Sequence, residues 1–212
     1  MFNTENILRT ILVIPGILLG FTFHEYAHAW VADRLGDKTP KFQGRLTLNP
    51  IAHIDPIGFL MILIFRFGWA KPVQTNPSAF KHYYKDDLKV SVAGVIGNLF
   101  VALIFSIFLG ILVNFPISNI KLYKILISIA DQGIFINCLL VIFNLLPIPG
   151  LDGFHILRDL FPKFFYRIAD SIYRYQMLII LIFIMSPLSD WIIIPPTLLL
   201  RNFFNSIIKF IV

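Results

Sequence analysis

The sequence predicts an all-α polytopic membrane protein, and composition, charge and segment length all point to this class. Hydrophobic residues make up 57% of the 212 residues, and the mean hydropathy is +0.78. Only 14% of the residues are charged, against about 25% in an ordinary soluble domain. So few charged side chains cannot cover a soluble globular protein, and a disordered chain would be more charged and less hydrophobic. Long uncharged stretches complete the case for membrane helices.

The apolar segments predict about four to five transmembrane helices. The first runs from about Ile7 to Ala32 and has no charged side chain between Arg9 and His24. It continues into polar residues without a small-residue cleavage site, so we expect an uncleaved helix rather than a secretory signal. The clearest span is Val90–Ile120, which carries no charge. We also expect spans at 121–146 and 175–189, with 197–212 lying on the membrane surface.

A small re-entrant or β-like element is expected between the first two spans. Run 57–65 is apolar but much shorter than the roughly 20 residues that a crossing helix needs, so it should dip into the membrane or lie at its interface. Residues 44–49 alternate in the manner of a strand. Such an edge could pair with an unwound substrate segment, although the same alternation is also typical of a region packed under the bundle.

The basic residues of the loops predict the topology. Segments 33–55, 66–89 and 147–176 together hold 13 of the 18 Lys and Arg residues, Arg66 among them. If run 57–65 does not cross, all three segments lie on one side of the membrane. The positive-inside rule makes this side cytoplasmic and places the N-terminus outside. No basic cluster is interleaved with aromatic residues, so we expect no nucleic-acid partner.

The motif that carries chemistry is the run His-Glu-Tyr-Ala-His at 24–28, at the cytoplasmic end of the first expected helix. His24 and His28 are one turn apart on the same helix face, so both imidazoles can reach one metal ion. Glu25 stands beside this face, where it can act on a metal-bound water without being a ligand. Ionisable groups inside a membrane segment need a compensating partner, which a Zn²⁺ ion would supply. The alternative is a helix end whose polar groups lie among lipid headgroups.

A catalytic zinc site usually has three protein ligands and one water, so a third ligand must come from elsewhere. Asp152 is the best candidate, because Pro147 and Pro149 end the preceding helix and stiffen the turn that presents this carboxylate. The charge pattern places this turn on the side of the two histidines. An equally good interpretation is that Asp152 caps a new helix. The other candidates are His155, His53, Asp55 and Asp131.

Three further features favour packing roles. Asn98, with Gly94 and Gly97, is more typical of a close helix contact with one polar bond than of a site group. Cys138 lies in an apolar run and should pack between helices. Asp131 interrupts a span and should lie near the outer interface or face the bundle interior.

The chain resembles the site-2 protease family of intramembrane zinc metalloproteases. The resemblance is carried by HEYAH at 24–28 and by NLLPIPGLDG at 144–153. The segments between these motifs, GRLTLNPIAHIDPIG, GWAKPVQTNP and SVAGVIGNLF, resemble the compact bacterial members, which lack a PDZ or CBS domain. The resemblance implies one Zn²⁺ per chain held by His24, His28 and Asp152, with Glu25 as the catalytic base. It also implies that Asn144 faces the reacting carbonyl.

The resemblance also implies a function and a location. The chain would hydrolyse peptide bonds in or near transmembrane segments of membrane-anchored proteins, in a bacterial inner membrane with the active site towards the cytoplasm. We expect one membrane-embedded metalloprotease domain over 1–212, with its core at 7–160 and the last span and a surface helix at 165–212. The alternative is a non-proteolytic zinc-binding transporter or sensor, for which Glu25 has no evident use.

Overall fold

The structure, a computed structural model, describes residues 4–65 and 68–211. Arg66 of the second basic segment and the two ends of the expected 1–212 domain lie outside the described residues. The elements in chain order are α1 (Thr4–Arg34), α2 (Thr39–Phe42), η1 (Pro50–Ala52), α3 (Pro56–Phe65), η2 (Pro77–Ala79), α4 (Tyr83–Asn114), α5 (Ile120–Asn144), α6 (Asp152–Leu160), α7 (Pro162–Arg174), α8 (Gln176–Met185) and α9 (Pro187–Ile211). No strand occurs among the described residues, which confirms the all-α class.

Four helices are long and apolar enough to cross a membrane, namely α1, α4, α5 and α9. This confirms the lower value of the expected four to five spans. The helices α3 and α8 have 10 residues each, which is too short to cross. The prediction that run 57–65 does not cross is therefore confirmed by the length of α3.

The C-terminal part differs from the expectation of a span at 175–189 followed by a surface helix. The helix α8 ends at Met185, Ser186 is extended, and α9 begins at Pro187. The element of spanning length is therefore α9, which contains most of the segment expected on the surface. Its two internal prolines, Pro195 and Pro196, do not end the helix. Prolines are tolerated in membrane helices because neighbouring groups satisfy the backbone that they leave unpaired.

The expected β-like edge at 44–49 is wrong. This stretch forms turns and bends, with Gly44 at a φ of +68°, and the isolated bridge in the described chain joins Ile54 to Ala70. The reason lies in Arg45, whose buried side chain donates to the carbonyl oxygens of Lys71 (2.9 Å) and Pro72 (2.8 Å). A guanidinium rather than a partner strand thus organises the backbone here, and the alternation marks no buried apolar face, because Leu48 is 50% exposed.

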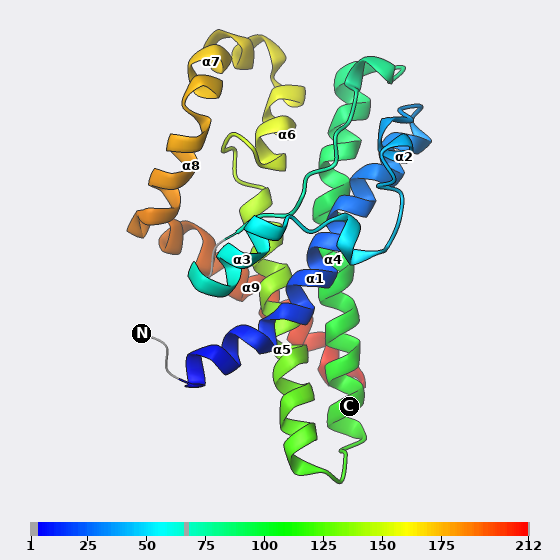
Figure 1. The fold of residues 1–212 in the computed structure, drawn as a ribbon, viewed down its shortest axis with the longest axis vertical. Coiled ribbons are helices and arrows are strands. Elements are labelled where there is room, and N and C mark those ends of the chain that lie inside the picture. The colour runs from blue at the N-terminus through cyan, green and yellow to red at the C-terminus, as the bar shows by residue number, and fades with distance from the viewer. Residues whose placement is uncertain (1–3, 66–67, 212) are drawn as a thin grey trace.

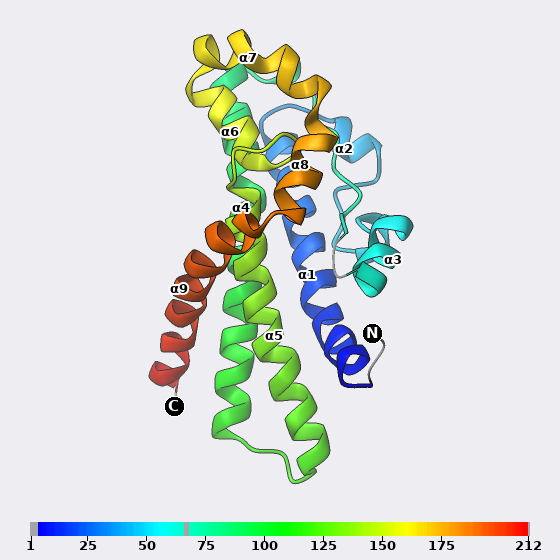
Figure 2. The same ribbon diagram turned by 90° about the vertical axis from the view of Figure 1, so that its left-hand side faces the viewer.

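The bundle core is formed where α4 and α5 run antiparallel, with α1 on one side and α9 on the other (Figures 1 and 2). Its buried side chains are Val101, Ala102, Phe105, Leu109, Ala130, Ile134, Cys138 and Phe204. Gly16 and Gly20 let α1 approach α5 closely: a Cβ at Gly16 would lie 2.7 Å from Ile136, and one at Gly20 would lie 2.6 Å from Asn137. The predicted packing role of Cys138, which is fully buried, is confirmed.

The polar connecting segments gather at one end of the bundle. Figure 1 shows α2, α6 and α7 at the end where α4 begins, and the turn between α4 and α5 at the opposite end. This arrangement agrees with the prediction that the basic segments share one side of the membrane. That this side is cytoplasmic stays a prediction.

A buried ion pair attaches α6 to α4. The Arg158 guanidinium is paired with Asp87 of α4 and, at 2.7 Å, with Asp159 of its own helix. The same guanidinium carbon lies 6.0 Å from the ring centroid of Tyr83, within reach of a cation–π contact. These contacts attach the last turn of α6, the helix that begins with Asp152, to α4.

Candidate active site

Three side chains from two distant segments meet at one point. His24 and His28 extend from α1, and Asp152 is the first residue of α6. The Nε2 atoms of the two histidines are 3.0 Å apart, and the Asp152 oxygens lie 3.4 Å from His24 Nε2 and 3.3 Å from His28 Nε2. These are the ligands that the sequence pattern and the resemblance pointed to. The structure brings all three together within 4.8 Å.

The chain returns to the histidines through a tight turn after α5. Gly150 has a φ of +89°, which glycine adopts at no steric cost. A Cβ at Gly153 would lie 2.3 Å from the carbonyl oxygen of Leu145, so the new helix begins in backbone contact with the end of the old one. The cap of α6 is Leu151, and no side chain caps this helix. Asp152 is therefore not the helix cap that the sequence also allowed.

The other candidates for the third ligand do not join this group. Asp131 forms an ion pair with Arg201 at 2.6 Å, and Asp55 accepts the Gly58 N–H at the start of α3. His53 is fully buried and bonds through Nε2 to the Thr47 carbonyl oxygen at 2.7 Å. His155 follows Asp152 by three residues on α6 without being part of the ligand group within the described chain.

The donor set fits a zinc ion. The Asp152 Oδ2 atom is buried and has no hydrogen-bond partner. His28 Nδ1 lies 2.8 Å from the Val90 carbonyl oxygen, which can only accept a hydrogen bond. The proton of neutral His28 is therefore on Nδ1, and the lone pair of Nε2 points into the group. Ligands about 2.0–2.2 Å from a tetrahedral Zn²⁺ are roughly 3.4 Å apart, close to the distances between these atoms.

The charge state of Asp152 suits a metal ligand. Burial alone would raise the pKa of this carboxyl, but His28 and His24 more than offset the burial and hold the pKa below its ordinary value. Burial lowers the pKa of the neighbouring His155. The carboxylate is thus ionised, and its oxygens face both Nε2 atoms.

Glu25 lies beside the ligand group and is held by a loop. Its side chain is buried, and Oε2 accepts the backbone N–H of Val73 at 2.7 Å. The loop around Val73 is fixed on one side by Arg45, as described above, and on the other by Asp37, which accepts the Asn76 N–H at 2.6 Å. Nothing in the side chain of Val73 indicates this role, because the contact is made by the backbone.

Asn144, expected from the resemblance to face the reacting carbonyl, is half-buried at the last residue of α5. Its side-chain nitrogen donates to the Leu140 carbonyl oxygen at 3.0 Å. This bond turns the amide nitrogen towards its own helix. The predicted role of Asn144 stays a prediction.

Sequence reasoning missed the contribution of α4 to the site. Asn98, expected to make a helix contact with one polar bond, lies with Oδ1 2.8 Å from His24 Nδ1. Gly94 was also expected at a helix contact, but it faces the imidazoles: a Cβ there would lie 2.4 Å from His28 Nε2. The available signal was the spacing of four residues between Gly94 and Asn98, in a span that is otherwise almost without polar side chains.

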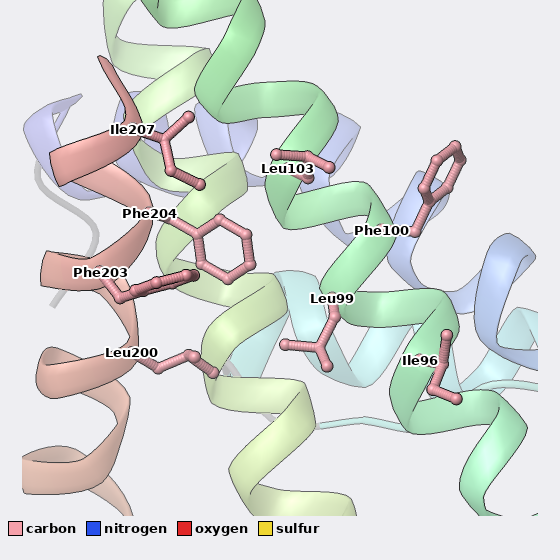
Figure 3. Close-up of a pocket in the computed structure, with 8 residues that line it drawn as sticks. All are labelled: Ile96, Leu99, Phe100, Leu103, Leu200, Phe203, Phe204 and Ile207. Atoms are coloured by element: carbon pink, nitrogen blue, oxygen red, sulfur yellow. The ribbon is translucent and has the colours of Figure 1, made fainter. Parts of the chain in front are cut away.

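An apolar groove elsewhere on the surface has no part in this site. It lies between α4 and α9, and Figure 3 shows its lining side chains, all of them aliphatic or aromatic. They are Ile96, Leu99, Phe100, Leu103, Leu200, Phe203, Phe204 and Ile207. The groove offers no group for peptide hydrolysis, and on a membrane helix such a surface suits hydrocarbon.

Comparison with known proteins identifies the family. The model of "Peptidase family M50" matches residues 113–188, which include the turn that presents Asp152. YwhC of Bacillus subtilis (strain 168), a predicted zinc metalloprotease, is 38% identical over 189 residues, covering 89% of this chain and 86% of YwhC. The chain belongs to peptidase family M50. This is the site-2 protease family, so the resemblance seen in the sequence is confirmed.

Two more distant relatives carry the same kind of name. Rip2 of Mycolicibacterium smegmatis, also a predicted zinc metalloprotease, is 31% identical over 192 residues, covering 85% of this chain and 70% of Rip2. MJ0611 of Methanocaldococcus jannaschii is 30% identical over 162 residues, covering 72% of each chain. No solved structure matches the chain. The membership of this peptidase family and the four apolar helices confirm the prediction of an intramembrane metalloprotease and do not favour the transporter or sensor.

Proposed function

We propose that the chain hydrolyses peptide bonds in or near transmembrane segments of membrane-anchored proteins, with one Zn²⁺ bound by His24, His28 and Asp152. The observation that carries this proposal is the meeting of these three side chains beside Glu25. The zinc metalloprotease names of the relatives support the same ion. When bound, zinc supplies a Lewis acid that makes a coordinated water acidic.

Glu25 serves as the general base. Its Oε2 atom is held by the Val73 N–H, which leaves Oε1 free to take a proton from the attacking water. The same carboxyl then returns the proton to the leaving nitrogen of the peptide. The bond to Val73 keeps the carboxylate in one orientation, so that proton transfer needs no rearrangement of the side chain.

Asn144 supports the developing charge. It stands at the end of α5, immediately before the turn to Asp152. For an amide donor to stabilise an oxyanion, its nitrogen must lie about 2.7–3.1 Å from the oxygen. The Asn144 nitrogen bonds to Leu140 in the substrate-free chain, so the amide rotates towards the carbonyl when a substrate binds.

The site lies near one membrane surface, where water can enter. His24 and His28 precede the end of α1 at Arg34 by ten and six residues, which at 1.5 Å per residue is about 15 and 9 Å. We propose that this end faces the cytoplasm of a bacterial cell, because the basic segments gather there. We further propose that residues 1–212 form a single membrane-embedded domain, since α1, α4, α5 and α9 pack on one another.

The test compares metal content and proteolysis in the purified full-length chain. Wild type should carry about one zinc per chain and cleave a model transmembrane substrate. Glu25→Gln should keep the zinc and lose cleavage by at least about 100-fold, the usual contribution of a general base. His24→Ala should lose both. His82→Ala, which removes an exposed imidazole at the cap of α4, serves as the histidine control.

Two results would overturn the proposal. One is full cleavage by Glu25→Gln, because this carboxyl has no substitute in the described site. The other is unchanged zinc content in His24→Ala. Zinc binding without proteolysis in the wild type, on several transmembrane substrates, would favour the transporter or sensor.

A further inference from the structure

One face of α4 lies against both histidines. Val90, Gly94 and Asn98 follow each other at intervals of four residues and therefore share this face. The carbonyl oxygen of Val90 accepts from His28 Nδ1, and the side chain of Asn98 meets His24 Nδ1, both at 2.8 Å. Gly94 stands between them and leaves room for the imidazole rings. The two histidines are thus held at their Nδ1 atoms, opposite the Nε2 atoms that face Asp152, by a helix that supplies no metal ligand.

The orientation of the Asn98 amide follows from its other contacts. Its nitrogen lies 3.1 Å from the Gly20 carbonyl oxygen and 3.2 Å from Asn137 Oδ1. The nitrogen of Asn137 in turn donates to the carbonyl oxygens of Gly16 and Gly133, so Asn137 offers its oxygen to Asn98. With the Asn98 nitrogen engaged by two acceptors, its oxygen must face His24.

This arrangement selects one tautomer of His24. Since Asn98 Oδ1 can only accept, Nδ1 of His24 carries the proton, and the lone pair of Nε2 points towards Asp152. Asn98 and Asn137 are both fully buried, so water does not replace their bonds in a packed interior. Of the two Nδ1 contacts, only the one to Asn98 involves a side chain and can be changed by substitution.

We propose that Asn98 is a positioning residue of the metal site, which holds His24 in the tautomer and ring orientation that bind the ion. Asn137 acts one step further away, by holding Asn98. This inference rests on the proposed zinc site and adds to it an outer partner for one ligand. Outer partners of metal-bound histidines typically affect metal affinity by 10–100-fold.

Two substitutions separate this role from a structural one. Asn98→Ala removes both the acceptor for His24 and the donor to Gly20 and Asn137. Asn98→Asp keeps an acceptor for His24 but removes the donor. If Asn98 serves only to join the helices, the two variants should be impaired alike, because both lose the links made by the amide nitrogen. If it positions His24, the aspartate should restore metal binding.

The experiment measures zinc affinity of the full-length chain in detergent, after chelator treatment, by competition with a zinc-binding dye. The melting temperature of the metal-free protein is recorded alongside. We expect zinc affinity to fall about 10–100-fold in Asn98→Ala and to stay within about threefold of wild type in Asn98→Asp. Ser106→Ala is the matched control, because Ser106 is a fully buried polar residue of α4 that bonds to Phe204 of α9 at 2.7 Å. Its zinc affinity should equal that of wild type.

Wild-type zinc affinity in Asn98→Ala would overturn the inference, and so would equal losses of affinity in the alanine and aspartate variants. If Asn98→Ala does not fold, the aspartate variant decides the question, since a loss of affinity above tenfold there contradicts the positioning role. These outcomes differ from a failure of the proposed function. In that case the wild type itself would bind no zinc that depends on His24.

Discussion

On one side of the candidate site the histidines rest on a helix of the bundle core, whereas on the other side Asp152 and the partner of Glu25 come from short segments. The histidine side consists of α1 against α4, with every imidazole Nδ1 bonded to α4. The opposite side depends on the turn before α6, on the Arg158 ion pair and on the loop that carries Val73. The first side is packed by long helices and the second is attached by individual polar contacts. The histidines are therefore preorganised by the bundle core, whereas the positions of Asp152 and of the Glu25 carboxylate depend on a few individual contacts.

The largest expected effect comes from filling the space at Gly94, which should displace the two imidazoles from their positions against α4. In Gly94→Ala the new Cβ would lie 2.4 Å from His28 Nε2 and 2.6 Å from His24 Cε1. Neither ring can move away from the new methyl group without losing its Nδ1 hydrogen bond to α4. We expect zinc affinity and cleavage to fall by at least about 100-fold. Zinc titration and a cleavage assay measure this, with Ser106→Ala as the control on the same helix; wild-type zinc affinity would refute the close packing.

A smaller effect is expected on the opposite side when the α6 attachment is broken. Arg158→Met leaves Asp87 and Asp159 without their buried cation, and loss of one partner of a buried pair typically costs about 3 kcal/mol. The metal-free protein should therefore melt at a lower temperature, and zinc affinity should fall about tenfold as α6 loosens. Arg167→Met, on the exposed part of α7, should change neither. Unaltered zinc affinity would show that Asp152 does not depend on this ion pair.

The most limited expected effect, a loss of cleavage with zinc binding and stability unchanged, concerns the orientation of Glu25. Val73→Pro removes the N–H that bonds to Oε2 and should lower cleavage roughly tenfold, about the value of one hydrogen bond to a charged group. Zinc content should not change, because Glu25 is not among the three ligands. The matched control is Val73→Ala, which keeps the N–H and should cleave at nearly the wild-type rate. Equal rates in the proline and alanine variants would remove the proposed role of this bond.

Much of the fold followed from the apolar segments, and the errors have definite causes. The spans at α1, α4 and α5 were predicted because long apolar stretches with few charges have few alternatives to a membrane helix. The last span was misplaced because the uncharged stretch at 175–189 was taken as the crossing segment, although the continuous helix of spanning length is α9, which runs from Pro187 to Ile211. The alternation at 44–49 was taken for an edge strand, although it surrounds the buried side chain of Arg45.

The site residues also divide into those that the local sequence predicted and those that it did not. His24, Glu25 and His28 were identified from the chain alone, since the helical repeat places residues four apart on one face whatever the rest of the protein does. Asp152 was one of several candidates, because nothing local distinguishes a ligand from a helix cap. Asn98 and Val73 belong to the site only through contacts with His24 and Glu25, which lie 74 and 48 residues away in sequence. Such contacts depend on how helices pack and loops return, and that packing is a property of the whole chain.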